Sequence, residues 1–270
     1  MLRDITLGQY YPADSILHKL DPRVKFTGTL VFIVALFLVK GVAGYAFITA
    51  ILGCLIVISR VPLKFMVKGM KAILFILLIT MAFNIFLTPG TVLAHWWIFT
   101  ITYEGVVLAV RMGLRLTYLV IGSSIMTLTT TPNALTDGME SLFAPLKVIH
   151  VPVHEISMMM SIALRFIPIL MEETDKIMKA QIARGADFES GNFIAKVKNM
   201  VPLLVPLFVS AFRRANDLAM AMEARCYHGG SGRTQMKPLR YKKRDYIALI
   251  LTAAFLAAAI VLHIFGGAWI

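Results

Sequence analysis

Charged residues are scarce in this sequence. Asp, Glu, Lys and Arg make up 16% of its 270 residues, whereas 58% of the residues are hydrophobic. Soluble domains usually contain about a quarter charged residues and fewer than half apolar ones. This composition excludes an ordinary soluble domain and predicts an all-α polytopic membrane protein.

Cysteines and catalytic motifs are also nearly absent. Cys54 and Cys226 have no ligand spacing to another Cys or His and cannot form a disulfide framework. The sequence contains no GxxxxGK[ST] or HExxH motif, and no Asp-rich pair inside an apolar run. His150 and His154 are four residues apart, but Pro152 disrupts the helix that would align them as metal ligands. We therefore expect no catalytic, cofactor or metal site in this chain.

Five apolar runs are long enough to cross about 30 Å of hydrocarbon as helices. They cover roughly residues 24–40, 42–59, 70–88, 105–130 and 246–266. The segment between the third and fourth runs contains no Lys or Arg, and its Trp96, Trp97 and Tyr103 are expected to anchor at the membrane surface.

Positive charge is concentrated in particular loops. The net charge is +12, and sixteen of the 27 Lys and Arg residues lie between positions 131 and 245. Other cations lie before or at the start of the first run, or between the second run and the start of the third: Arg3, Lys19, Arg23, Lys25, Arg60, Lys64, Lys68 and Lys71. Cytoplasmic loops carry the excess of Lys and Arg, so five spans in an N-in, C-out arrangement explain this distribution. The lipid bilayer, and not a nucleic acid, is the partner that this charge indicates.

The segment before the last run is too apolar and too varied to be disordered. Thr131 and Pro132 form a helix start, and longer helices are expected over roughly 153–185 and 198–227, the last beginning with Pro202 and Pro206.

The chain therefore divides into three parts. Residues 1–130 contain an N-terminal segment and four spans, 131–245 form a cytoplasmic three-helix coupling domain, and 246–270 contain the last span.

Residue spacing distinguishes the faces of the two longer helices. The pairs Glu172–Lys176 and Asp175–Lys179 have the i,i+4 spacing of ion pairs on a solvated helix. The following helix carries a stripe of small residues that would let another helix cross closely. This stripe consists of Ala211, Ala215 and Ala219.

Arg111 and Arg115 fall inside the fourth apolar run on one helical face. A charge near mid-membrane costs about 2.5–3.5 kcal/mol, so both side chains must face protein or water. We favour a structural contact with neighbouring spans or backbone carbonyls over a role in transport.

Each of the two longer helices ends in an arginine between small residues. The motifs are Ala183-Arg184-Gly185 and Ala224-Arg225-Cys226. A solvated surface charge is the ordinary interpretation of such an arginine. A guanidinium fork also suits carboxylates and backbone carbonyls, however, and small neighbours would let it enter a groove on a partner. Two such motifs indicate two grooves, and hence a partner with two-fold or pseudo-two-fold symmetry.

The sequence resembles the transmembrane T component of energy-coupling factor (ECF) transporters, the vitamin importers of prokaryotes. The resemblance covers nearly the whole chain. It is carried by DSILHKLDPRVK, by LRLTYLVIGSSIMTLTTTPNAL, SLFAPLK and ALRFIPILMEETDKIMKAQIARG, and by PLLVPLFVSAFRRANDLAMAMEARCY.

The resemblance implies a non-catalytic subunit of the prokaryotic cell membrane. Two ATPase subunits would bind ATP and magnesium, and a separate S component would hold the vitamin. Arg184 and Arg225, with their neighbours, would each dock in one ATPase. Cys226 stands where the family pattern has glycine, so we expect the last helix of the coupling domain to continue toward Gly229.

Two other functions stay open at this stage. A conventional ABC importer permease would typically offer one coupling helix per subunit, whereas this chain carries two arginine motifs. A membrane-embedded lipid or prenyl transferase would need metal-binding acids or an acid–base pair near the membrane. The acids here lie in helix surface pairs instead.

Overall fold

The structure, a computed structural model, describes residues 10–96, 99–186, 188, 193–229, 236 and 238–265. Its elements are α1 (Pro22–Leu38), α2 (Gly41–Ser59), α3 (Leu63–Leu87), β1 (Val92–Trp96), β2 (Phe99–Thr102), α4 (Tyr103–Thr129), α5 (Pro132–Phe143), the 3₁₀ helix η2 (Ala144–Ile149), α6 (Val153–Ala183), α7 (Phe193–Glu223) and α8 (Lys243–Phe265). The predicted all-α polytopic membrane class is confirmed, with one short hairpin added.

Two compact units share the chain. The membrane-helix unit consists of Gly8–Gly138 and Leu239–Ile270, and the α6–α7 unit contains Met139–Pro238. Helix α5 is divided between them.

The helices that could cross a membrane differ in part from the predicted set. By length and composition, α2, α4, α6 and α8 qualify among the described residues, and α3 would be a fifth as a bent pair, Leu63–Lys71 and Ile73–Leu87. Helix α1, the predicted first span, has 17 residues and falls outside this group. Helix α6 is long and apolar enough to cross a membrane, although the sequence analysis places it in the cytoplasm. Its cytoplasmic placement therefore stays a prediction.

The two ends of α1 explain its length. The Asp21 side chain accepts a hydrogen bond from the backbone N–H of Arg23 at 3.0 Å, and Pro22 occupies the first turn, where its missing N–H is harmless. At the other end Val39 is extended and Gly41 has a positive φ of 79°, which turns the chain into α2. The helix therefore spans about 25 Å.

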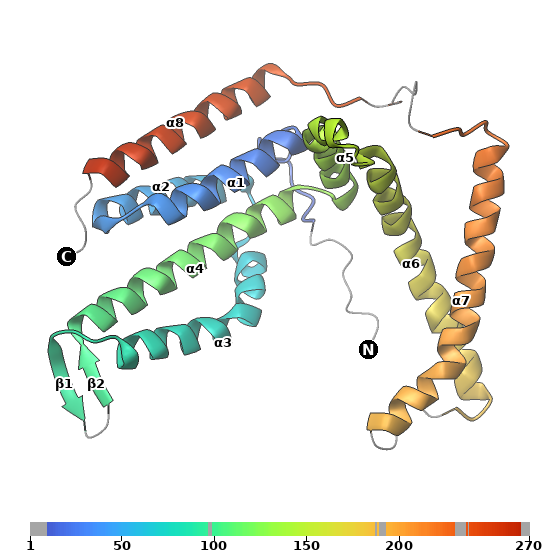
Figure 1. Ribbon diagram of the computed structural model, residues 1–270, viewed down its shortest axis with the longest axis horizontal. Coiled ribbons are helices and arrows are strands. Elements are labelled where there is room, and N and C mark those ends of the chain that lie inside the picture. The colour runs from blue at the N-terminus through green and yellow to red at the C-terminus, as the bar shows by residue number, and fades with distance from the viewer. Residues whose placement is uncertain are drawn as a thin grey trace. The chain divides into compact units, whose positions relative to one another are not determined.

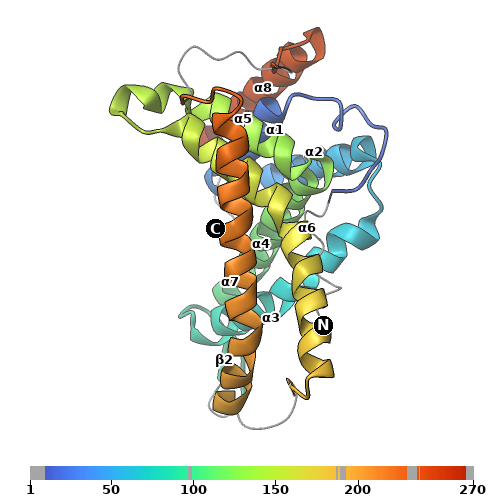
Figure 2. The ribbon, with the colours of Figure 1, turned by 90° about the vertical axis from the view of Figure 1, so that its right-hand side faces the viewer.

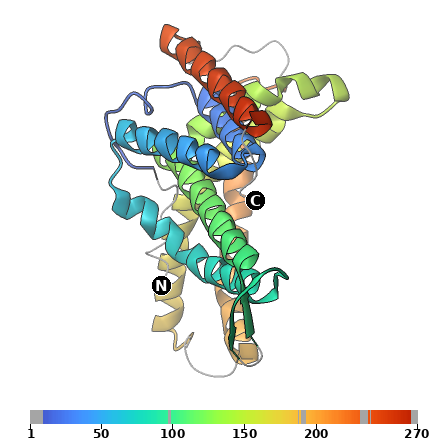
Figure 3. The same cartoon turned by 90° about the vertical axis from the view of Figure 1, so that its left-hand side faces the viewer.

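Within the membrane-helix unit, α3 packs along α4, and α1 packs against α4 and α8 (Figures 1 and 3). Helices α1 and α8 run parallel. The N–H of Asp21 donates to the Asp245 carboxylate at their starts, and His263 is hydrogen-bonded to the Leu38 carbonyl near their ends. A parallel first and last span is what the predicted five-span N-in, C-out arrangement requires.

Helix α4 runs in the opposite direction. Its last residue, Thr129, accepts a hydrogen bond from Lys25 Nζ at 2.8 Å near the start of α1. Farther along, Tyr118 Oη lies 2.6 Å from Thr49 Oγ1 of α2. The buried core around these contacts is apolar and includes Phe32, Leu36, Val39, Tyr45, Ile48, Leu52, Ile125 and Leu128.

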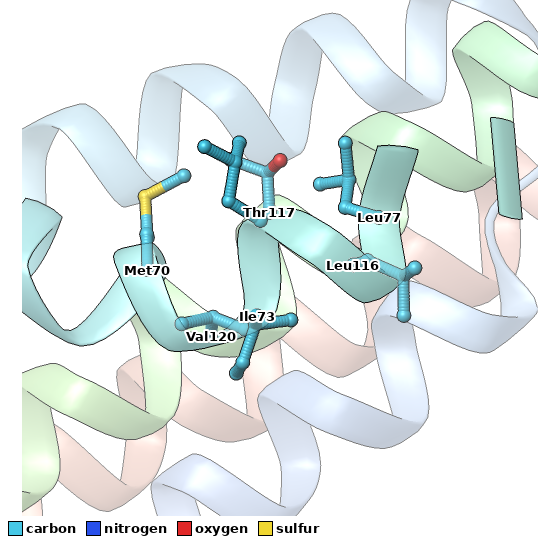
Figure 4. A pocket seen from close by; sticks show the side chains of 7 residues that line it. Met70, Ile73, Leu77, Leu116, Thr117 and Val120 are labelled. Atoms are coloured by element: carbon cyan, nitrogen blue, oxygen red, sulfur yellow. The ribbon is translucent and has the colours of Figure 1, made fainter. Parts of the chain in front are cut away.

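The interface of α3 and α4 is closely packed. A cavity of only about 10 Å³ remains between them, and it is lined mainly by aliphatic side chains (Figure 4). Such a volume is at the limit for one water molecule, so this cavity cannot hold a vitamin.

The segment between α3 and α4 forms an antiparallel hairpin, in which Trp96 pairs with Phe99. Of the three expected anchors, Tyr103 is exposed at the start of α4, Trp96 ends β1, and Trp97 lies outside the described residues. The interfacial role of these aromatic residues stays a prediction.

In the α6–α7 unit the two long helices lie side by side and antiparallel (Figure 2). Gln181 Nε2 donates to the Pro202 carbonyl at 3.3 Å, and Arg214 Nη2 donates to Glu173 Oε2 at 2.9 Å. The ion pair of α6 is therefore formed by Glu173 with Arg214 of α7. The predicted pairs within α6, Glu172–Lys176 and Asp175–Lys179, do not lie within ion-pair distance.

Helix α7 begins earlier than predicted. It starts at Phe193, which places Pro202 and Pro206 inside the helix and not at its beginning. A proline inside a helix removes one backbone hydrogen bond, but this helix has further turns on both sides to sustain it. The prediction wrongly treated the prolines as the helix start.

The close approach of α3 to α4 predicts a stability effect at Gly105. A Cβ atom there would lie 2.8 Å from the Asn84 carbonyl oxygen and 3.0 Å from that of Ile85, which are backbone atoms. We expect Gly105→Ala to lower the free energy of unfolding by about 1–3 kcal/mol. The measurement is denaturation of the purified protein in mixed micelles.

Gly53→Ala is the matched control, because no atom lies within 4 Å of a Cβ atom at that position. Equal stability of the two variants would contradict the proposed close approach.

Candidate functional site

The first arginine motif closes α6 with a pair of backbone hydrogen bonds. The N–H of Gly185 donates to the Ile182 carbonyl at 2.9 Å, and the N–H of Ala186 donates to the Gln181 carbonyl at 3.0 Å. Gly185 has a φ of 89°, the left-handed conformation that glycine adopts without strain. This is the Schellman arrangement, and it leaves Arg184 as the last residue before the turn.

The second arginine motif closes α7 in the same way. The N–H of Cys226 donates to the Glu223 carbonyl at 2.8 Å, and the N–H of Tyr227 donates to the Met222 carbonyl at 3.1 Å. Cys226 itself takes the left-handed conformation, with a φ of 57°. The expected continuation of this helix toward Gly229 is therefore wrong. The two hydrogen bonds outweigh the strain of about 1–2 kcal/mol that a non-glycine residue has there.

Both arginine side chains are exposed. The residues that precede them, Ala183 and Ala224, are small and exposed as well, so neither covers the arginine side chain. Among the described residues, neither guanidinium has an ion-pair or side-chain hydrogen-bond partner. A cation at a helix C-terminus is also favoured by the helix dipole. The two ends therefore present two guanidinium groups that can bind an acceptor on another molecule.

The two arginine motifs lie at opposite ends of the α6–α7 pair. Gln181 and Pro202 mark the end where α6 stops, and the chain then follows α7 for a further 23 residues to Arg225. This length corresponds to about 35 Å of helix. One small binding site cannot accept both arginines, whereas two separate sites can.

The small residues of α7 line a groove toward α6. Ala211, Ala215 and Ala219 form one wall of a cavity of about 320 Å³, and three side chains of α6 form the other: Ile162, Phe166 and Leu170. Ala215 and Ala219 stay exposed. The close helix crossing expected at this stripe stays a prediction, and the structure provides an open apolar groove there.

Arg111 and Arg115 of α4 are both partly buried. The Arg115 guanidinium lies over the Phe37 ring of α1, 5.3 Å from its centroid. A cation over an aromatic face is stabilised by the ring quadrupole. This contact supports the structural interpretation of Arg115, and that interpretation stays a prediction for Arg111.

His150 and His154, which are four residues apart in the sequence, have different surroundings. His154 Nδ1 lies 2.8 Å from Glu140 Oε1, and His150 ends η2 in the left-handed conformation. Within the described part of the chain, no group of three His, Cys, Asp or Glu residues is arranged to hold a metal ion.

Sequence reasoning missed a buried polar junction at the start of α1. Asp21 and Asp245 are 8% and 2% exposed, and they meet although 224 positions separate them. The Asp-Pro pair at 21–22 is a recognisable helix start. No sequence signal links it to Asp245, because that contact depends on the packing of α1 against α8.

Comparisons with known proteins agree with the resemblance. A family model described as "Cobalt transport protein" (CbiQ) matches residues 13–236. The chain is similar to the "Energy-coupling factor transporter transmembrane protein EcfT" of Clostridium kluyveri, with 54% identity over 99% of this chain and 100% of the relative. It is 52% identical to the protein of that name from Ruminiclostridium cellulolyticum, over 97% of this chain and 98% of the relative. It is 46% identical to the one from Bacillus subtilis, over 95% of this chain and 98% of the relative.

The shared closure of α6 and α7 predicts opposite effects of two substitutions. Gly185→Ala introduces strain at a positive φ and should weaken the end of α6 by about 1 kcal/mol, whereas Cys226→Gly should strengthen the end of α7 by a similar amount. Hydrogen exchange of the Ala186 and Tyr227 amides measures each end directly.

Faster exchange at Ala186 and slower exchange at Tyr227 are the expected results. A change of the same sign at both amides would contradict the equivalence of the two ends.

Proposed function

The chain belongs to the cobalt transport protein (CbiQ) family as a transmembrane T component of energy-coupling factor transporters, and on this basis we propose that it couples two ATPase subunits to a substrate-binding S component. In this proposal the chain catalyses no reaction itself. ATP and magnesium bind to the ATPases, and the vitamin binds to the S component. The complex would lie in the cytoplasmic membrane of a bacterium.

The observation that carries the proposal is the equivalence and separation of the arginine motifs. Both helix ends close with the same hydrogen bonds, both arginines are exposed, and about 35 Å of helix separates them. Two equivalent cationic ends on one pair of helices suit two related partners better than one.

Recognition at each end would rest on the guanidinium group. Its planar fork donates several hydrogen bonds at once, to a carboxylate or to backbone carbonyls at the end of a partner's helix. The exposed Ala183 and Ala224 would let the partner's surface approach the helix backbone. An arginine that anchors such an interface commonly contributes about 2 kcal/mol or more to binding.

Coupling then requires that motion at the arginine ends reaches the membrane. ATP changes the affinity of the ATPases for each other, and a ligand shifts a conformational equilibrium only by such a difference. Helices α6 and α7, each of 31 residues, would carry this displacement. The ion pair of Glu173 with Arg214 and the hydrogen bond of Gln181 to the Pro202 carbonyl join the two helices at two points, and through these contacts they would move together.

The proposal predicts the effect of removing the guanidinium groups. Arg184→Ala or Arg225→Ala should reduce copurification of the ATPases, and the double variant should lower vitamin uptake about tenfold or more, without loss of membrane insertion. Uptake is measured in proteoliposomes with the tritiated vitamin that the wild-type complex accumulates from a panel of riboflavin, folate, biotin and thiamine.

Lys176→Ala and Arg213→Ala are matched controls, because each removes an exposed cation from α6 or α7 about two turns or more before the helix end. Both should retain wild-type uptake. Wild-type uptake by the double variant would refute the docking role. Copurification of a second copy of this chain, in place of an S component, would indicate a conventional importer permease instead.

A further inference from the structure

From residue 10 onward, the chain passes between its two compact units at two places. One crossing lies at Gly138–Met139 within α5, and the other at Pro238–Leu239 before α8. A displacement of the α6–α7 unit that travels along the covalent chain can enter the membrane helices at these two places. Gly138 and Leu239, the residues on the membrane-helix side of these crossings, both contact the same short segment, Asp21, Pro22 and Arg23, which we call the α1 corner.

At the first crossing, α5 packs directly on the α1 corner. Gly138 is buried, and a Cβ atom there would lie 2.9 Å from the Cβ atom of Pro22 and 3.4 Å from the backbone nitrogen of Arg23. The proline ring cannot rotate away from such a contact. Only a residue without a side chain therefore lets α5 lie this close to the start of α1.

At the second crossing, Arg23 of the α1 corner contacts the segment that leads into α8. Arg23 Nη2 donates to the Leu239 carbonyl at 2.9 Å. The same guanidinium lies over the Tyr241 ring, 4.9 Å from its centroid. Arg23 thus fixes both the backbone and a side chain within three residues of the crossing.

The α1 corner is itself fixed to α8 by a buried carboxylate. Asp245 is 2% exposed, and its two oxygens accept hydrogen bonds from the backbone N–H of Asp21 at 2.9 Å and of Lys242 at 2.7 Å. Buried hydrogen bonds to a charged acceptor are strong, and their donors would be left unsatisfied if the contact opened. The starts of α1 and α8 therefore move together.

We propose that the α1 corner is the element that converts displacement of the α6–α7 unit into movement of the membrane helices. Arg23 and Gly138 are its positioning residues: one holds the chain that enters α8, and the other holds α5 against α1. A displacement at either crossing is delivered to the start of α1, and from there to α8 and to the end of α4. This inference rests on the proposed coupling function.

The test measures transport per ATP hydrolysed. Wild-type and variant chains are assembled with the ATPases and the S component in proteoliposomes, and uptake of the tritiated vitamin from the panel above and ATP hydrolysis are followed in the same vesicles. In Arg23→Ala and in Gly138→Ala the ATPases should stay bound and hydrolysis should continue. The number of vitamin molecules imported per ATP should fall roughly fivefold or more, the lower end of ordinary coupling energies.

Two substitutions of the same chemical kind serve as controls. Arg60→Ala removes an exposed guanidinium that donates to the Asp14 carbonyl at 3.3 Å, and Gly53→Ala adds a Cβ atom with nothing within 4 Å. Both should keep the wild-type ratio. If Arg23→Ala does not accumulate, Arg23→Gln tests the same point, because it keeps a polar side chain but loses the cation over Tyr241.

The outcomes separate this inference from the proposed function. An unchanged ratio in the Arg23 and Gly138 variants, with ATPases bound, overturns the role of the α1 corner. So does a fall in uptake that only follows the amount of assembled complex, because that result indicates a structural role. Failure of the proposed function would be recognised earlier, as a wild-type chain that binds no ATPase.

Discussion

The last carbonyl groups of an α-helix have no partner within the helix and need hydrogen-bond donors from the turn that follows. The geometry of that turn determines which side chain is exposed at the helix end. Helices α6 and α7 solve this problem identically, with two backbone hydrogen bonds around a residue of positive φ. The turn stops each helix directly after an arginine. The side chain is then exposed at the tip, where the helix dipole favours its charge. The proposed docking function depends on this local geometry at both ends.

The membrane-helix unit is organised around a second polar contact, the carboxylate of Asp245. It satisfies backbone N–H groups at the starts of α1 and α8 together, in a position almost closed to solvent. The Lys25 ammonium group joins the end of α4 to the same region. The starts of α1 and α8 and the end of α4 are therefore held close together. Apart from a few further polar contacts, such as that of Tyr118 with Thr49, the buried core of these helices is apolar and has little directional preference.

Much of the fold could be predicted because hydrophobic run length and charge distribution act locally along the chain. The helices and the Ala-Arg ends of α6 and α7 follow from such patterns. The position of Pro202 misled the prediction because a proline can stand inside a long helix as well as at its start. The conformation of Cys226 was missed because residue preference alone opposes it, and only the hydrogen bonds of the turn compensate. The contact of Asp21 with Asp245 could not be predicted, since it depends on tertiary packing across nearly the whole sequence.

Photo-cross-linking from the two helix ends tests the central claim most directly. A photoreactive residue replaces Ile182, which is 55% exposed beside the first arginine motif, or Ala224 beside the second arginine. The assembled complex is then irradiated in membranes while it transports. The account predicts that each position captures an ATPase subunit. Capture of lipid, or of this same polypeptide alone, at both positions would contradict it.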